Sequence, residues 1–251
     1  MNRRTFVGSL ALLLPPALLG GCSLLRPIVP TYRYRLTVEV DTPQGMRSGS
    51  SVIEVATSIA SKLALRPGEL GWRVRGEAVA VELPNGKVLF ALLSKPGQAE
   101  GANQFALNAL ADRSWANEQE FLATVNAAIA RRDIAELPRV AKTSRRRWEP
   151  APPPTDPAID YPLLVTFGNI ADPKTVAKVD PNDLAASFGP GVRLRRITVQ
   201  MTDAPVTTGI EKRLGWLPQY YDKMLDGHRL NDSQLLPNAL SQTEFEQGSK
   251  K

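Results

Sequence analysis

The side chains that could support catalysis in this chain are few, and a single histidine limits the choice. His228 is the only imidazole, and Asp222 and Asp226 are near enough in sequence to orient it. A serine nucleophile needs such a base, but the serine-rich segment 48–51 lacks the G-x-S-x-G pattern of a nucleophile elbow. We therefore interpret His228 as a surface residue beside acids.

Carboxylate pairs are the other route to hydrolysis, for example of a glycosidic bond. Each acid of the densest acidic group also fits a turn or a helix cap, where a carboxylate accepts backbone N–H bonds. The sequence thus leans away from an enzyme and keeps a hydrolase that uses carboxylates or His228 as the alternative. The acids of this group are Asp160, Asp172, Asp180 and Asp183.

Metal, cofactor and nucleic-acid sites are not expected. A zinc site needs several clustered ligands, and the chain has 1 His and 1 Cys. Gly189-Pro190-Gly191 is too short for a phosphate-binding loop and precedes an expected strand, where such loops precede a helix. Nucleic-acid binding would need a dense basic face interleaved with aromatic residues, which the sequence does not show.

The one cysteine has a setting that indicates a specific chemistry. Residues 2–5 are basic, and residues 6–19 form an apolar run that is shorter than the roughly 20 residues of a permanent transmembrane helix. The run closes on Leu19, Gly20, Gly21 and Cys22. This arrangement resembles the lipobox signal peptide of bacterial lipoproteins. The alternative is a buried structural cysteine that follows an uncleaved anchor.

The lipoprotein resemblance implies that residues 1–21 are a removed signal peptide and that Cys22 carries two acyl chains, which suffice for stable membrane attachment. Ser23 follows the cysteine where an Asp would resemble an inner-membrane retention signal, so we expect an outer-membrane address facing the periplasm. Arg3, Arg4 and Phe6 resemble the twin-arginine export motif, although its preceding Ser or Thr and its later Lys are missing. An ordinary Sec signal fits equally.

The composition of the remaining chain is that of an ordinary globular protein. Hydrophobic residues make up 43% and charged residues 22% of the 251 residues, so a core can form without covalent staples. If Cys22 carries lipid, no thiol is left for a disulfide. Without Arg3 and Arg4 the formal charge of +6 becomes +4, which indicates a weakly basic surface.

Alternating polarity predicts an antiparallel sheet. Residues 32–40 alternate between apolar and polar, and residues 50–57 follow as a return strand after turn residues 41–45. Residues 71–83 and 88–93 predict a second hairpin, because Asn-Gly lies between them. Since residues 88–93 are apolar throughout, we expect a central strand that helices cover on both faces.

Two helices and a long loop follow. Residues 103–110 are expected to be helical, and Asn117 with Glu120 predicts a capped helix that ends at Arg131-Arg132, where cations suit the helix dipole. Residues 143–157 contain five prolines and must be a linker or surface loop. Its possible partner contact is the group Arg145, Arg146, Arg147 and Trp148. These could meet phosphate, lipid headgroups or a partner, but we favour a solvated loop with the tryptophan packed on the body.

The C-terminal part returns to strands. Residues 161–167 form a buried strand that we expect to share one sheet with residues 88–93. Residues 180–183 predict the capped start of a helix that ends at Gly189, and residues 194–201 predict a strand with a bulge. Thr207 or Thr208 would cap a further helix over residues 210–217.

These patterns predict a single α+β domain with a mainly antiparallel sheet. The expected organisation is signal peptide 1–21, tether 22–31, domain 32–236 with the loop 143–157, and flexible tail 237–251. Segments that begin at Tyr32, Tyr161 and Pro205 are similar to uncharacterised bacterial proteins, which implies a shared fold and no activity. The expected function is that of a lipid-anchored envelope protein that binds a protein partner or an envelope component, or else an envelope hydrolase.

Overall fold

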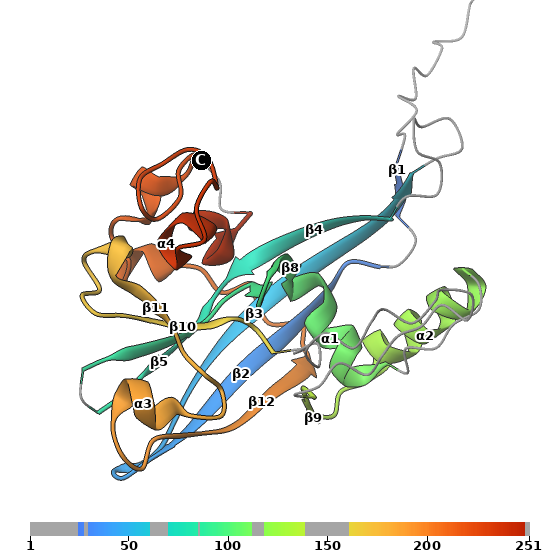
Figure 1. Ribbon diagram of the computed structural model, residues 1–251. Coiled ribbons are helices and arrows are strands. Elements are labelled where there is room, and N and C mark those ends of the chain that lie inside the picture. The colour runs from blue at the N-terminus through green and yellow to red at the C-terminus, as the bar shows by residue number, and fades with distance from the viewer. Residues whose placement is uncertain are drawn as a thin grey trace, which may run out of the picture.

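The computed structural model describes residues 25–27, 30–60, 70–84, 86–111, 118–138 and 161–248. The body is α+β, as predicted, with antiparallel strands in two main sheets and short helices around them (Figure 1). The large sheet has the strand order β13 (Glu246–Gln247), β4 (Leu70–Glu77), β3 (Gly45–Ala60), β2 (Tyr32–Thr42), β12 (Arg193–Met201) and β9 (Ala135–Glu136), and β1 (Leu25–Pro27) pairs with β3. The small sheet has the order β11 (Val176–Lys178), β10 (Leu164–Phe167), β6 (Val88–Ala91) and β5 (Val79–Glu82), while β7 (Ser94–Lys95) and β8 (Gln98–Gly101) form a separate short ladder.

The first hairpin is the longest element of the fold. β2 (Tyr32–Thr42) pairs with β3 (Gly45–Ala60) along its whole length. The alternation predicted for residues 32–40 is confirmed, since every second side chain is buried and the others are half-buried. The turn is tighter than expected because the strands continue to Thr42 and Gly45. Gly45 has φ of 105°, a conformation that favours glycine.

Residues 71–83 do not form the single strand that we predicted. β4 (Leu70–Glu77) pairs with β3 in the large sheet, whereas β5 (Val79–Glu82) pairs with β6 (Val88–Ala91) in the small one. The chain changes sheet next to Gly76, whose φ is 147°. Across this break the inward-facing positions shift from the even-numbered Trp72 and Val74 to the odd-numbered Val79 and Val81, a slip that the prediction of one strand did not take into account.

The two apolar strands share one sheet, as predicted. β10 (Leu164–Phe167) pairs with β6, with Leu164 opposite Ala91. β11 (Val176–Lys178) pairs with the other edge of β10 after the 3-10 helix η1 (Pro173–Thr175). Strand β6 is therefore central, with a neighbour on each side.

The covers of β6 differ from the helices that we expected. Leu89 and Ala91 belong to the main core, which also contains the inward side chains of β2. On the opposite face Phe90 packs with Trp216 and Phe245 from the C-terminal segment, at ring-centroid distances of 5.7 to 6.2 Å among Phe90, Phe167, Trp216 and Phe245. A sheet and an irregular segment thus supply most of the cover.

The C-terminal segment is part of the core. It contains η2 (Ile210–Lys212), η3 (Leu217–Tyr220), α4 (Leu236–Ala239), η4 (Gln242–Glu244) and β13 (Glu246–Gln247). The flexible tail predicted for residues 237–251 is wrong over 237–248, because Asn238 and Phe245 are 0% exposed. β13 also pairs with β4, which attaches this segment to the large sheet.

Two helices cover one end of the sheets (Figure 1). α1 (Ala102–Leu110) confirms the helix predicted at 103–110, and α2 (Glu118–Ala130) confirms the next one, although Asn117 lies outside the described residues. The cations predicted for the last turn lie just after α2, whose last turn contains no basic residue. Arg132 donates to the Ile129 carbonyl of α2 at 2.8 Å, whereas Arg131 donates to the Leu110 carbonyl at the end of α1 at 2.7 Å. Within the described ranges, no helix has the length and apolarity to cross a bilayer.

The segment 180–201 follows the prediction with one shift. α3 (Leu184–Phe188) ends at Gly189 as expected, but its N-cap is Asp183, which accepts a bond from the Ala186 N–H at 3.1 Å. Asp180 instead accepts from the Asn182 N–H in the preceding turn. β12 (Arg193–Met201) pairs with β2 on one side and with β9 (Ala135–Glu136) on the other, and the predicted bulge is confirmed by a register shift after Leu194.

Candidate functional site

His228 is held at the surface beside one acid. Its side chain is 71% exposed, and Nδ1 lies 3.1 Å from an Asp226 oxygen. Burial opposes ionisation of Asp226, but hydrogen bonds from His228 and Asn238 lower the pKa of this carboxyl overall. Asp222 does not orient the imidazole, because it pairs with Arg229 at 3.1 Å. In the described ranges no serine hydroxyl bonds to His228, so a serine–histidine pair is not assembled there.

The acids proposed for hydrolysis serve the backbone instead. Asp172 caps η1 by accepting from the Lys174 N–H at 3.0 Å, and Asp180 and Asp183 have the turn and cap roles described above. These findings confirm the turn and cap reading for the three described acids. Asp160 lies outside the described residues. Within the described part of the chain, no three His, Cys, Asp or Glu residues are grouped to hold a metal.

The anchor and loop predictions also fall outside the described residues. They comprise the export motif (Arg3, Arg4, Phe6), the lipobox (Leu19, Gly20, Gly21), the lipidation residue Cys22, and the contact group Arg145, Arg146, Arg147 and Trp148.

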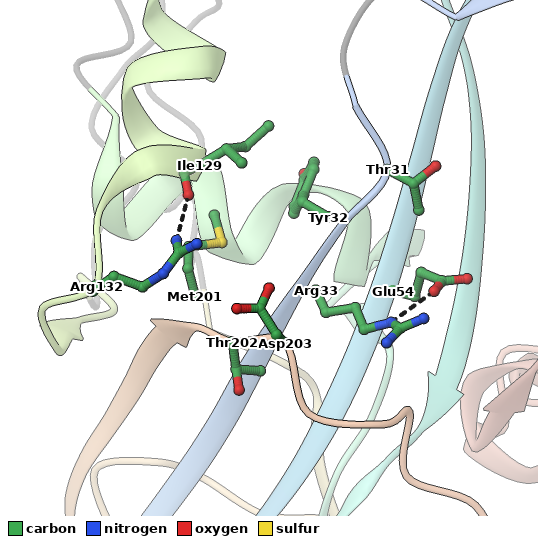
Figure 2. A pocket seen from close by; sticks show the side chains of 9 residues that line it. All are labelled: Thr31, Tyr32, Arg33, Glu54, Ile129, Arg132, Met201, Thr202 and Asp203. Carbon is green, nitrogen blue, oxygen red and sulfur yellow. Dashed lines mark hydrogen bonds and ion pairs between the residues drawn. The ribbon is translucent and has the colours of Figure 1, made fainter.

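A cavity lies where β2 begins and β12 ends, beside the C-terminal end of α2 (Figure 2). It has a volume of about 310 Å³. We call it the sheet-end cavity, and none of its residues was predicted as a site. Its lining consists of Thr31, Tyr32, Arg33, Glu54, Ile129, Arg132, Met201, Thr202 and Asp203.

The pleat of the large sheet positions the charged wall of this cavity. Arg33 of β2 lies opposite Glu54 of β3, which lies opposite Arg75 of β4. All three side chains therefore project from the outer face of the large sheet, the face that points away from the main core. Arg33 donates to Glu54 at 2.8 Å and Arg75 donates to the other carboxylate oxygen at 3.0 Å. The hydrogen bond from Arg33, more than that from Arg75, lowers the pKa of Glu54. Glu54 is thus a fixed negative charge between two cations.

The segment 202–207 crosses the outer face and closes the cavity on one side. The Thr202 N–H donates to the Arg33 carbonyl, and Thr207 exchanges two hydrogen bonds of 2.8 and 3.1 Å with the backbone of Val52. Val52 is only 5% exposed because this segment covers it. Figure 2 shows the Asp203 carboxylate directed from this segment into the space between Arg132 and Arg33.

The prediction that Thr207 or Thr208 caps a helix is wrong. Thr207 instead continues the large sheet along the edge of β3, beyond the point where β4 leaves it. η2 starts after Gly209, which supplies no side-chain cap. The expected helix over 210–217 is reduced to two short 3-10 helices.

A second cavity, of about 530 Å³, adjoins the same edge of β3. Its wall includes Glu77, a 9%-exposed residue whose carboxylate accepts the Ile210 N–H at 2.8 Å. Burial raises the pKa of Glu77, and the nearby charges of Glu211 and Glu246 raise it further. Sequence reasoning missed Glu77, because an acid at the end of an alternating strand is usually solvated.

Searches for related proteins return no family model, no curated protein and no solved structure that matches this chain.

Proposed function

We propose that this protein is a lipid-anchored accessory protein of the bacterial cell envelope, which holds a protein partner or an envelope component on the periplasmic side of a membrane. We assign it to the outer membrane because Ser23, and not an Asp, follows Cys22. The observation that carries the proposal is the single cysteine at position 22, preceded by Leu19-Gly20-Gly21 and an apolar run. Two acyl chains on that cysteine hold a protein on a bilayer without a spanning helix.

The position of β1 (Leu25–Pro27) supports a short link between lipid and sheet. Leu25 pairs with Ala60 at the end of β3, and Cys22 precedes Leu25 by three residues. Three residues span about 10 Å when fully extended. A lipid on Cys22 would therefore keep this end of the large sheet near the bilayer surface. The expected tether 22–31 is correspondingly shortened by a paired segment.

A binding role fits the described acids better than a catalytic one. Asp172, Asp180, Asp183 and Asp226 all accept hydrogen bonds from nearby backbone or side-chain groups. The alternative, an envelope hydrolase, is favoured by one observation, the raised pKa of Glu77 in its cavity. A hydrolase would release product from isolated envelope polymers and lose that activity in Glu77→Gln, whereas an accessory protein would release none.

The lipidation test compares the unaltered protein with Cys22→Ser in a bacterial host. We expect the unaltered protein in the membrane fraction, with an N-terminal peptide that starts at Cys22 and carries acyl mass. We expect the variant to lose both properties. An unmodified cysteine in the membrane-bound protein, or a variant that fractionates and weighs as before, would contradict the proposal.

Two further variants address export and partner binding. Replacing Arg3 and Arg4 by lysines should block export if the twin-arginine pathway is used and leave it intact if the Sec pathway is used. Crosslinking and affinity capture of the lipidated protein should identify a reproducible partner. Loss of that partner when residues 145–148 are deleted would assign the contact to the loop, and its retention would exclude the loop.

A further inference from the structure

Arginines outnumber carboxylates around the sheet-end cavity. Glu54 and Asp203 are the two carboxylates that line it, and Glu54 already serves two of the arginines. We call the surrounding surface the arginine face. It is formed by Arg33 and Arg35 of β2, Arg73 and Arg75 of β4, and Arg132 after α2.

The four arginines on strands are close together. Arg33 and Arg75 are separated by one strand, and Arg35 and Arg73 lie one rung away in opposite directions. At the usual spacing of strands and residues, the four Cα atoms fall within about 10 Å across and 14 Å along the sheet. Arg35 and Arg73 have no ion pair within the described residues. Like charges at this spacing repel each other, so the arrangement costs stability unless an anion is bound.

The opposite end of the same sheet is arranged differently. Arg196 pairs with Glu39 at 2.9 Å, and Arg195 pairs with Asp41 at 3.3 Å. These arginines therefore have carboxylates of their own. Because the charges of Arg195 and Arg196 are paired, these two residues serve as controls for the arginine face.

The arginine face lies at the end of the sheet that carries β1. Arg73 is opposite Ala56, and Leu25 of β1 is opposite Ala60, four residues further along β3, or about 13 Å at 3.3 Å per residue. If Cys22 is lipidated, the nearest phosphates are those of the bilayer. Guanidinium groups bind phosphate oxygens in a bidentate manner, and juxtamembrane arginines each add about 1 kcal/mol of attraction to an anionic surface.

We propose that the arginine face binds the phosphates of anionic phospholipids, with one headgroup in the sheet-end cavity between Arg33 and Arg132. The inference rests on the proposed membrane anchor for its choice of lipid. The cavity of about 310 Å³ is some ten times the roughly 30 Å³ share of one water molecule, so it has room for a headgroup. Contact with the bilayer orients the protein with this end of the large sheet toward the membrane.

The test uses the chain from residue 22 with Cys22→Ser, so that acylation does not mask the binding. Co-sedimentation is measured with vesicles of phosphatidylcholine alone and of phosphatidylcholine with 30% phosphatidylglycerol. We expect binding to the anionic vesicles only, decreasing with salt. Arg35→Gln and Arg73→Gln should each weaken it about fivefold. The control variants Arg195→Gln and Arg196→Gln should leave it unchanged.

Further measurements separate the alternatives. Asp203→Asn should strengthen binding, because it removes a carboxylate that repels phosphate. Thermal unfolding should show that the Arg35 and Arg73 variants remain folded, since neither residue has an ion pair to lose among the residues that the structure describes. Equal binding to both vesicle types, an equal loss in the Arg195 and Arg196 controls, or full competition by inorganic phosphate at constant ionic strength would overturn the lipid assignment.

Different results would refute the membrane anchor and the headgroup site. Unmodified Cys22 in cells together with arginine-dependent vesicle binding would refute the anchor and leave the headgroup site. Acylated Cys22 together with no preference for anionic vesicles would refute the headgroup site and leave the anchor.

Discussion

The two sheets come into close backbone contact at Gly49. Gly49 of β3 faces inward beneath β5, and a Cβ at this position would lie 2.1 Å from the Ala80 carbonyl oxygen and 2.9 Å from its carbon. Favourable contacts need about 3.5 Å, so Gly49→Ala would force the two backbones apart by roughly 1 Å or more. Since Val79 and Val81 on β5 are at most 1% exposed, the displacement would also loosen the main core.

The size of the effect follows from two opposing terms. Overpacking costs about 1–3 kcal/mol, and the upper value applies because the clash is with backbone. Replacing glycine by alanine restores up to about 1 kcal/mol through the unfolded chain. The expected net loss is about 2 kcal/mol, or about 4–8 °C in the unfolding midpoint for a domain of this size.

The assay is thermal and urea unfolding followed by tryptophan fluorescence, since the buried Trp216 reports on the core. Gly215→Ala is the matched control, because a Cβ there meets nothing within 4 Å, and it should change stability by less than about 0.5 kcal/mol. If Gly49→Ala unfolds at the midpoint of the unaltered protein, then β3 and β5 do not cross in backbone contact and the stacking of the sheets is misplaced.

Three further predictions concern buried groups. Phe245→Ala should lower the free energy of unfolding by about 3–5 kcal/mol, measured with urea. A loss below about 1 kcal/mol would show that the C-terminal segment is not packed in the core. Glu77→Gln keeps the acceptor for Ile210 but removes the charge. Because the pKa of Glu77 is raised, the free energy of unfolding falls as pH rises through that pKa. The variant should therefore become more stable relative to the unaltered protein as pH rises above the usual range of a glutamate; a variant whose relative stability falls with rising pH would contradict the raised pKa. Glu54→Gln should lower the free energy of unfolding by about 1 kcal/mol at pH 7. Because the pKa of Glu54 is lowered, this difference should disappear as pH falls through that pKa, and a difference that does not change with pH would show that the ion pairs do not stabilise the fold.

The strand pattern could be predicted because it is periodic and local. Residues 32–40 alternate strictly, and the structure buries the apolar set. The pairing of residues 88–93 with 161–167 was also predictable, since a strand that is apolar on both faces must lie inside a sheet. The bulge in residues 194–201 followed from one slip in the alternation.

The sheet-end cavity could not be predicted from local patterns. It combines residues near positions 32, 54, 130 and 202, which only long-range pairing brings together. Only the charged pair in its wall could have been predicted. A two-residue turn at Pro43-Gln44 sets the register of the first hairpin so that Arg33 lies opposite Glu54. The change of sheet near Gly76 is marked by a shift of the inward positions, from the even-numbered Trp72 and Val74 to the odd-numbered Val79 and Val81. The prediction of one strand over residues 71–83 did not take this shift into account.

The burial of Phe245 also has a consequence for the timing of folding. Phe245 contacts rings that precede it by up to 155 positions, and β13 pairs with β4 over a similar separation. The ribosome must therefore release residue 245 before the aromatic cluster of Phe90, Phe167, Trp216 and Phe245 can form, and pairings this distant in sequence are slow to form. A nascent chain that carries only the first hairpin has an exposed apolar face and no partner for it. Such a chain remains threadable for most of its synthesis, and a pathway that exports folded cargo would have to wait until residue 245 has packed.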